Sequence, residues 1–193
     1  MTEREKLLSR EYYNSRDPEL LECYHRAKEL LQKWHALSSR DTEGKALLLK
    51  ELFGRLEEGV WLEAPFYCDY GMHIEIGKNT FINTGAVLLD CAKIIIGQNV
   101  LIGPNVQVYT ATHPLSAKER VLQNQEPDSA PYLTKALPVS IGDNCWIGGN
   151  SVILPGVSIG ENTTIAAGSL VSKDIPANVL AMGSPAKIIR QLS

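Results

Sequence analysis

The sequence predicts a mainly β protein, a parallel β-helix built from six-residue repeats. Residues 141–171 repeat in sixes, with an aliphatic residue at the first place, Asn or Gly at the fourth and a small residue at the fifth. An α-helix would repeat its apolar residues about every 3.6 positions and a strand about every two, so neither explains this period. The fourth place marks a tight corner, because Gly and Asn best tolerate a positive φ.

The same pattern begins earlier in the chain. Aliphatic first places run from Ile76 to Leu88 and, after a slip of two residues, from Ile96 to Val108. Repeats of this kind form triangular coils whose inward aliphatic side chains stack on one another. We therefore expect a β-helix over residues 61–175, entered through the extended residues 61–70, where Pro65 forbids a helix.

An N-terminal helical segment is predicted over residues 1–60 from its start signals and apolar spacing. Asp17 followed by Pro18 is a helix start, because an acidic N-cap and Pro at the first helical place are both favoured. An apolar stripe follows at helical spacing: Leu20, Tyr24, Ala27, Leu31 and Trp34. A second helix should begin at Asp41, continue through Leu56 and end at Gly59. Neither helix can bury its stripe alone, so both should pack on the first coils or on a neighbouring subunit.

The period of six is interrupted once and then ends. Residues 114–138 are polar and contain Pro127, Pro131 and Pro138. A long irregular insertion in a repeat fold is commonly functional, and we expect it to leave the coil as an extruded loop over a neighbouring groove. Residues 176–193 are a candidate C-terminal cap, because the last coil of a repeat fold needs a cover.

Composition excludes several classes of protein. The chain of 193 residues is 44% hydrophobic with a net charge of -3, so it lacks the basic excess of a nucleic-acid surface. No stretch reaches the roughly 20 apolar residues that cross a bilayer, and the charged start does not resemble a signal peptide. The four cysteines show no CxxC spacing. We expect a reducing, cytoplasmic setting, no membrane and no nucleic-acid partner.

Because the core of a β-helix is apolar, chemistry must lie on its outer faces, corners or loop. His113 lies where a coil meets the extruded loop, and an imidazole suits general-base work near neutral pH, although a plain surface histidine fits equally well. Trp146 should point outward, as a subunit contact or a ligand platform. A zinc site is disfavoured, because His73 and His113 are the only histidines in the repeat region and lie about two coils apart.

Several motifs carry a family resemblance over nearly the whole chain. They are Tyr12-Tyr13-Asn14, Asp17-Pro18-Glu19-Leu20, Tyr109-Thr110-Ala111-Thr112-His113-Pro114, Cys145-Trp146-Ile147-Gly148, Ile153-Leu154-Pro155-Gly156-Val157 and Ala181-Met182-Gly183-Ser184-Pro185-Ala186. Together they resemble the maltose and galactoside O-acetyltransferases. The resemblance implies a left-handed β-helix, a homotrimer with active sites between subunits, acetyl-CoA as donor, a sugar acceptor, and His113 as general base in direct transfer.

The resemblance also implies the other site residues. Acceptor-binding places fall at Asp69, Asn83, Asp90, Cys91 and Ser15. Cys91 and Ser15 depart from the family pattern, because sugar-specific members can have an acid at these two places. Cofactor-binding places fall at Trp146, Gly149, Ala167, Ser172, Lys173 and Arg190. Lys173 and Arg190 suit the phosphates of coenzyme A, whereas the repeat alone can account for the small residues.

Two other functions remain open from the residues. One is a zinc-dependent hydratase of the β-helix kind, and the other is a non-catalytic trimeric scaffold. The His113 corner beside a long loop argues against a scaffold, because a scaffold needs neither.

Overall fold

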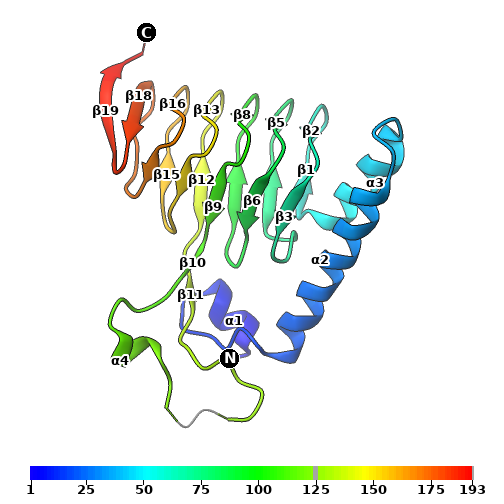
Figure 1. Ribbon diagram of the computed structural model, residues 1–193, viewed down its shortest axis with the longest axis vertical. Helices are drawn as coiled ribbons and strands as arrows, with labels where there is room; N and C mark the ends of the chain where they lie inside the picture. Colours follow the sequence, from blue (N-terminus) through cyan, green and yellow to red (C-terminus); the bar gives the residue numbers. More distant parts are fainter. Residues whose placement is uncertain (124–125, 193) are drawn as a thin grey trace.

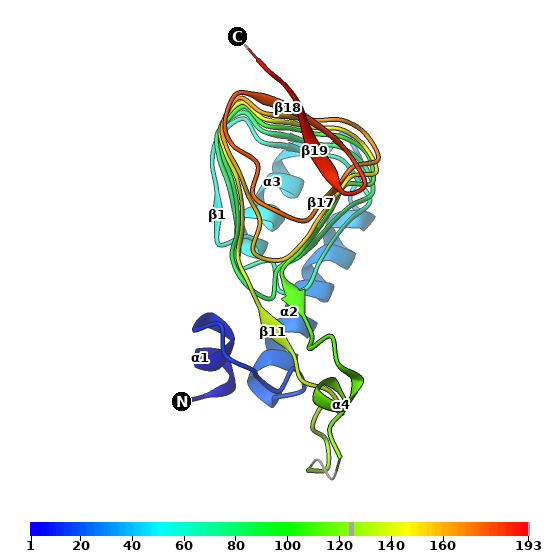
Figure 2. The same ribbon diagram turned by 90° about the vertical axis from the view of Figure 1, so that its left-hand side faces the viewer.

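A left-handed parallel β-helix forms the body of the protein, and helices cover one end of it (Figure 1). The structure, a computed structural model, describes residues 1–123 and 126–192. Seen along its axis, the helix is triangular, with one sheet on each side (Figure 2).

The first face is a five-stranded parallel sheet. In spatial order it comprises β1 (Arg55–Leu56), β4 (Ile74–Ile76), β7 (Ile94–Ile96), β12 (Val139–Ile141) and β15 (Ser158–Ile159). The third face has the same size. It comprises β3 (Phe66–Cys68), β6 (Ala86–Leu89), β9 (Gln107–Tyr109), β14 (Val152–Ile153) and β17 (Leu170–Val171).

The second face is the longest and carries the C-terminal strand. It comprises β2 (Trp61–Leu62), β5 (Phe81–Ile82), β8 (Leu101–Ile102), β13 (Trp146–Ile147), β16 (Thr164–Ile165), β18 (Val179–Gly183) and β19 (Ala186–Gln191). All neighbours pair in parallel except β19, which runs antiparallel to β18. The tail thus forms a hairpin at the last coil, and β19 itself is largely exposed (Figure 1).

The predicted places of the six-residue repeat are confirmed. First-place residues such as Ile147 and Ile165 are fully buried, and burying each stabilises the fold by about 1.5–3 kcal/mol. Fourth-place residues have positive φ, for example 56° at Asn144 and 85° at Gly156. The corner asparagines also bond to one another from coil to coil, as Asn144 Nδ2 donates to Asn162 Oδ1 at 3.0 Å.

The helices pack on the start of the β-helix. They are α1 (Glu3–Leu8), α2 (Pro18–Ala36) and α3 (Thr42–Leu52). Asp17 caps α2 as predicted, and Asp41 caps α3. Leu52 is buried with the first coils, so α3 closes one end of the triangular core (Figure 2).

Three details of the helical segment differ from the prediction. Tyr24 is 37% exposed, with Lys28 Nζ 4.6 Å above its ring, because it packs on that cation rather than on the core. The second helix ends at Leu52, and Leu56 already pairs with β4 as part of β1. Gly59 has a φ of 74° and lies at a coil corner instead of a helix end. The first coil therefore begins before residue 61.

The extruded loop contains helix and strand that its sequence did not predict. It leaves the third face after β9 and returns to the first face at β12, and an antiparallel pair, β10 (Ala111–Thr112) and β11 (Lys135–Ala136), forms its base. It also contains α4 (Ala117–Arg120). The loop projects away from the coils and lies beside α1 (Figure 1). Within residues 1–123 and 126–192, no helix is long and apolar enough to cross a membrane.

Candidate functional site

A groove runs along the second face, over the outward side of its strands. Residues that stack in register, from Phe81 through Leu101 and Trp146 to Thr164 and Leu180, form its floor. The cavity measures about 600 Å³. Its polar surface is small, so it suits a ligand with a sizeable apolar part.

Small residues at the corner line one side of this groove. Cβ atoms added at Gly148 and Gly149 would lie 2.4 Å from the backbone nitrogen of Ala167 and 2.9 Å from the carbonyl oxygen of Pro104. The close stacking of the coils is therefore a sufficient reason for glycine at both positions. Ala167, by contrast, is exposed, and its side chain faces the groove.

The structure brings together only some of the predicted cofactor residues. Trp146, Gly149 and Ala167 all line the groove, and so does Asn83, which was predicted for the acceptor. Ser172 and Lys173 are exposed and follow β17 on the third face. Arg190 lies in β19 opposite Leu180, one strand beyond the last residues that line the groove.

His113 lies at the base of the extruded loop, and its side chain is exposed. Its Nδ1 is 2.7 Å from the carbonyl oxygen of Leu133 on the returning arm of the loop. Because a carbonyl can only accept, Nδ1 carries the proton in this bond, and the lone pair of the neutral ring lies on Nε2. The ring meets Tyr132 edge-on, with centroids 5.5 Å apart. A second cavity, of about 380 Å³, is lined by His113, Tyr132 and Arg120.

A cluster of buried polar groups lies where α2 meets the coils. Asp90 has no exposed surface, and its carboxylate accepts hydrogen bonds from the backbone amides of Asp69, Tyr70 and His73 at 2.9–3.2 Å. Its side chain is thus fully engaged in holding the turn that carries Asp69.

Asp69 is the less buried carboxylate of this cluster. The Cys91 thiol donates to Asp69 Oδ2 at 3.4 Å. Burial, and then the nearby charge of Asp90, raise the pKa of Asp69 above its usual range. Burial and the charge of Asp69 also raise the pKa of the Cys91 thiol. A protonated thiol is a poor nucleophile, so Cys91 suits a hydrogen-bonding role.

Cys145, at a small-residue place of the repeat, is no better suited to act as a nucleophile. Cys145 is buried, and its thiol donates to the carbonyl oxygen of Gly160 at 3.1 Å. Burial raises its pKa. All four cysteines are free.

Among the residues that the structure describes, no group of three or more His, Cys, Asp and Glu side chains could hold a metal ion. His73 is buried, and its Nδ1 is 2.7 Å from the carbonyl oxygen of Asp90.

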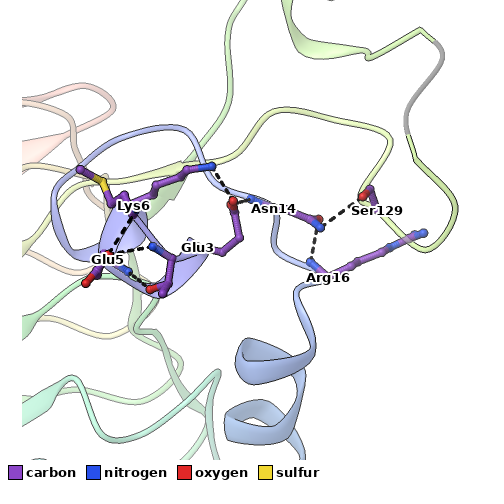
Figure 3. A network of polar contacts seen from close by, with 8 residues as sticks. Glu3, Glu5, Lys6, Asn14, Arg16 and Ser129 are labelled. Atoms are coloured by element: carbon purple, nitrogen blue, oxygen red, sulfur yellow. Dashed lines mark hydrogen bonds and ion pairs between the residues drawn. The ribbon is translucent and has the colours of Figure 1, made fainter.

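The residues in and beside the extruded loop differ in how far the sequence pointed to them. Ser15 is half-buried in the segment between α1 and α2, and its neighbour Asn14 bonds to the extruded loop (Figure 3). Tyr132 and Arg120 lie in the aperiodic loop, where no repeat pattern indicates which side chains face His113. The family resemblance, by contrast, pointed to the segment between α1 and α2 through residues 12–14 and Ser15.

Comparisons with known proteins agree with this architecture. Residues 138–173 match the family described as bacterial transferase hexapeptide (six repeats), and residues 6–57 match the maltose acetyltransferase hexapeptide capping motif. The chain is 40% identical to the galactoside O-acetyltransferase of Escherichia coli over 168 residues, which cover 87% of this chain and 78% of that protein.

Two solved structures are similar over the full chain. A maltose O-acetyltransferase from Clostridium difficile superposes with a TM-score of 0.93 at 40% identity, covering 100% of this chain and 98% of the other. A hexapeptide-repeat acetyltransferase of Vibrio cholerae, solved with acetyl coenzyme A, has a TM-score of 0.88 at 40% identity, covering 100% of both chains. The protein described here belongs to the maltose and galactoside O-acetyltransferase family of hexapeptide-repeat acyltransferases.

Proposed function

We propose that the protein transfers an acetyl group from acetyl-CoA to a hydroxyl group of a sugar related to maltose, glucose or a galactoside. The observation that carries this proposal is the groove on the second face, where Trp146 and Gly149 of one coil converge with Ala167 of the next. Its apolar floor and its side lined by Gly148 and Gly149 suit the pantetheine arm of coenzyme A. The solved Vibrio cholerae relative, which contains acetyl-CoA, supports the same donor.

His113 is the proposed general base. Its Nε2 takes the proton from the acceptor hydroxyl while the oxygen attacks the thioester carbonyl. The tetrahedral intermediate then collapses, the carbon–sulfur bond breaks, and the imidazolium returns its proton to the departing thiolate. The bond from Nδ1 to Leu133 suits this role, because it leaves Nε2 free to accept a proton. Direct transfer needs no acyl-enzyme, in keeping with the raised pKa values of the Cys91 and Cys145 thiols.

The active site is proposed to lie between subunits of a homotrimer. Within one chain, His113 belongs to the corner between the third and first faces, whereas the groove lies on the second face. Among the residues that the structure describes, the two cavities share no lining residue, which supports a site that a second chain completes. A neighbouring copy that presents its groove to His113 would complete the site.

Acceptor binding is assigned to Asp69, Asn83, Cys91 and Ser15, with Asp90 in a supporting position. Asp69 can accept a hydrogen bond from a sugar hydroxyl, while Cys91 orients its carboxylate. Asp90 is too deeply buried to reach an acceptor, so we assign it to holding the Asp69 turn. Lys173 and Arg190 are assigned to the phosphates of coenzyme A, and the four free thiols fit a reducing, cytoplasmic setting.

The test is a thiol-release assay with acetyl-CoA and a panel of acceptors. Maltose, glucose, a galactoside, serine and an amino sugar should be compared at equal concentration, and the products identified by mass spectrometry. The proposal expects thiol release that depends on the sugar and an acetyl ester on that sugar. Turnover with serine or with an amine alone would assign another acceptor class, and no turnover with any hydroxyl compound would contradict the proposal.

A further inference from the structure

The orientation of His113 depends on a segment that is distant in sequence. The carbonyl oxygen of Leu133 sets the tautomer of the ring, and Leu133 belongs to the returning arm of the extruded loop. Within the loop, Leu133 N donates to Arg120 O at 2.9 Å, and Leu122 N donates to Pro131 O at 3.1 Å. These two bonds hold the outgoing and returning arms of the loop to each other, but they do not attach either arm to the helices.

The N-terminal segment provides a fixed point for that arm. Tyr13 N donates to Thr134 O at 3.0 Å, one residue from Leu133. Tyr13 is 3% exposed and packs with Leu7 of α1 and Leu20 of α2. The returning arm is therefore attached to a buried cluster that also holds the first two helices.

The side chain of Asn14 makes the second attachment (Figure 3). Its Oδ1 accepts from the backbone amide of Ala130 at 2.9 Å. Its Nδ2 donates to Ser129 Oγ at 3.3 Å, a bond drawn in Figure 3. The same Oδ1 accepts from the backbone amide of Arg16 at 3.1 Å, which fixes the amide plane. Ala130 is buried, so its amide would lose a partner that water cannot readily replace.

Asn14 is itself held in place by α1. Its backbone amide donates to the carboxylate of Glu3, which also receives the ammonium group of Lys6 (Figure 3). A continuous path of hydrogen bonds thus runs from α1 through Asn14 to residues 129–130, and the same arm continues to Leu133 and His113.

We propose that Asn14 is a positioning residue for the base, holding the returning arm so that the Leu133 carbonyl keeps His113 in its Nδ1–H tautomer. This inference rests on the proposed role of His113. Without Asn14, Tyr13 and the β10–β11 pair still hold residues 134–136, but residues 129–130 lose their attachment. The Leu133 carbonyl can then shift, the Nδ1 bond lengthens, and molecules with the proton on Nε2 accumulate. In those molecules Nε2 already carries a proton and cannot take one from the hydroxyl group of the sugar.

Two readouts on Asn14→Ala test the proposal. We expect kcat to fall by about 10- to 100-fold, the size of effect expected when a reacting group is misplaced by a distant mutation, with the KM for acetyl-CoA within about two-fold. Nitrogen-15 shifts of the His113 imidazole, assigned with His113→Ala, should show the Nδ1–H tautomer in the wild-type protein and a mixture in Asn14→Ala. A purely structural role of Asn14 would leave that tautomer unchanged.

Two further variants serve as controls. Ser129→Ala removes only the long bond from Nδ2, so its kcat and tautomer should remain close to those of the wild type. Asn14→Asp keeps an oxygen for the Ala130 and Arg16 amides and should recover most of the kcat that Asn14→Ala loses.

The outcomes separate this proposal from the proposed function. If Asn14→Ala retains wild-type kcat, or loses kcat with an unchanged tautomer, Asn14 does not position the base. If the wild-type ring has its proton on Nε2, the inference fails even where Asn14→Ala does not fold. If His113→Ala remains active while Asn14→Ala alters the tautomer, the proposed function fails and the structural link stands.

Discussion

The Nδ1 atom of His113 lies 2.7 Å from the carbonyl oxygen of Leu133, and this contact leaves Nε2 as the nitrogen that can accept a proton. The two residues are 20 positions apart and come from opposite arms of the extruded loop. The loop thus orients the base that lies at its own foot, so its fold and the proposed chemistry are coupled.

The two exposed tryptophans of the second face allow a matched comparison. Trp61 and Trp146 occupy equivalent outward places and are 53% and 56% exposed, but only Trp146 lines the groove. Trp146→Ala should weaken coenzyme A binding by about 10-fold, a loss of ~1.4 kcal/mol. Trp61→Ala should leave it unchanged. Calorimetric titration measures the affinity of both variants for coenzyme A. Equal losses of affinity would show that the cofactor does not bind in this groove.

Substitution of Asp69 should affect the stability of the protein and its binding of the acceptor in opposite directions. Its pKa is raised by burial and by Asp90, so the stability that it contributes is complete below its unfolded pKa and is lost as pH rises through its folded pKa. At pH 7 the ionised carboxylate of Asp69 therefore destabilises the folded state, and the neutral amide of Asp69→Asn does not. The variant should have a higher free energy of unfolding than the wild type at pH 7, and the difference should shrink toward pH 4.

The same substitution should impair binding of the acceptor. An amide offers a hydroxyl group a weaker acceptor than a carboxylate, so the KM for the sugar should rise while the KM for acetyl-CoA stays constant. Urea unfolding at both pH values and steady-state kinetics check the two halves. A variant that is less stable at pH 7, with an unchanged sugar KM, would contradict both assignments.

The ladder of corner asparagines predicts a graded loss of stability. Asn144 has a φ of 56°, accepts from Asn99 Nδ2 at 3.1 Å and donates to Asn162 Oδ1 at 3.0 Å. Asn144→Ala loses both bonds and adds the cost of a left-handed alanine, together about 2 kcal/mol. Asn144→Gly tolerates the φ and should lose only about half as much. Urea unfolding at one protein concentration compares them, and equal losses would show that backbone conformation contributes nothing.

The regular parts of the fold could be predicted from the sequence because each repeat carries its own local signals. The aliphatic first place and the Asn or Gly corner are needed in every coil, so Ile147 and Asn144 are interpretable without their neighbours. The end of α3 was harder to predict. Leu52 and Leu56 share a helical spacing, and only the pairing of Leu56 with β4 shows that the chain has already entered the first coil.

The candidate site could be predicted only in part. Trp146, Gly149 and Ala167 lie at repeat positions, so their convergence follows from the coil. The contacts of His113 depend on residues 114–138, where no period relates one side chain to another. Asn14 meets Ala130 across 116 positions, a pairing that no local pattern indicates.

The central claim is that His113 is the base and that the groove holds the donor, and one pair of measurements on His113→Ala tests it most directly. Thiol release from acetyl-CoA in the presence of the best sugar should fall by about 10²- to 10⁴-fold, the usual contribution of a general base. Calorimetry should show coenzyme A affinity unchanged, because His113 lies outside the groove. Turnover within a few-fold of the wild type would contradict the claim.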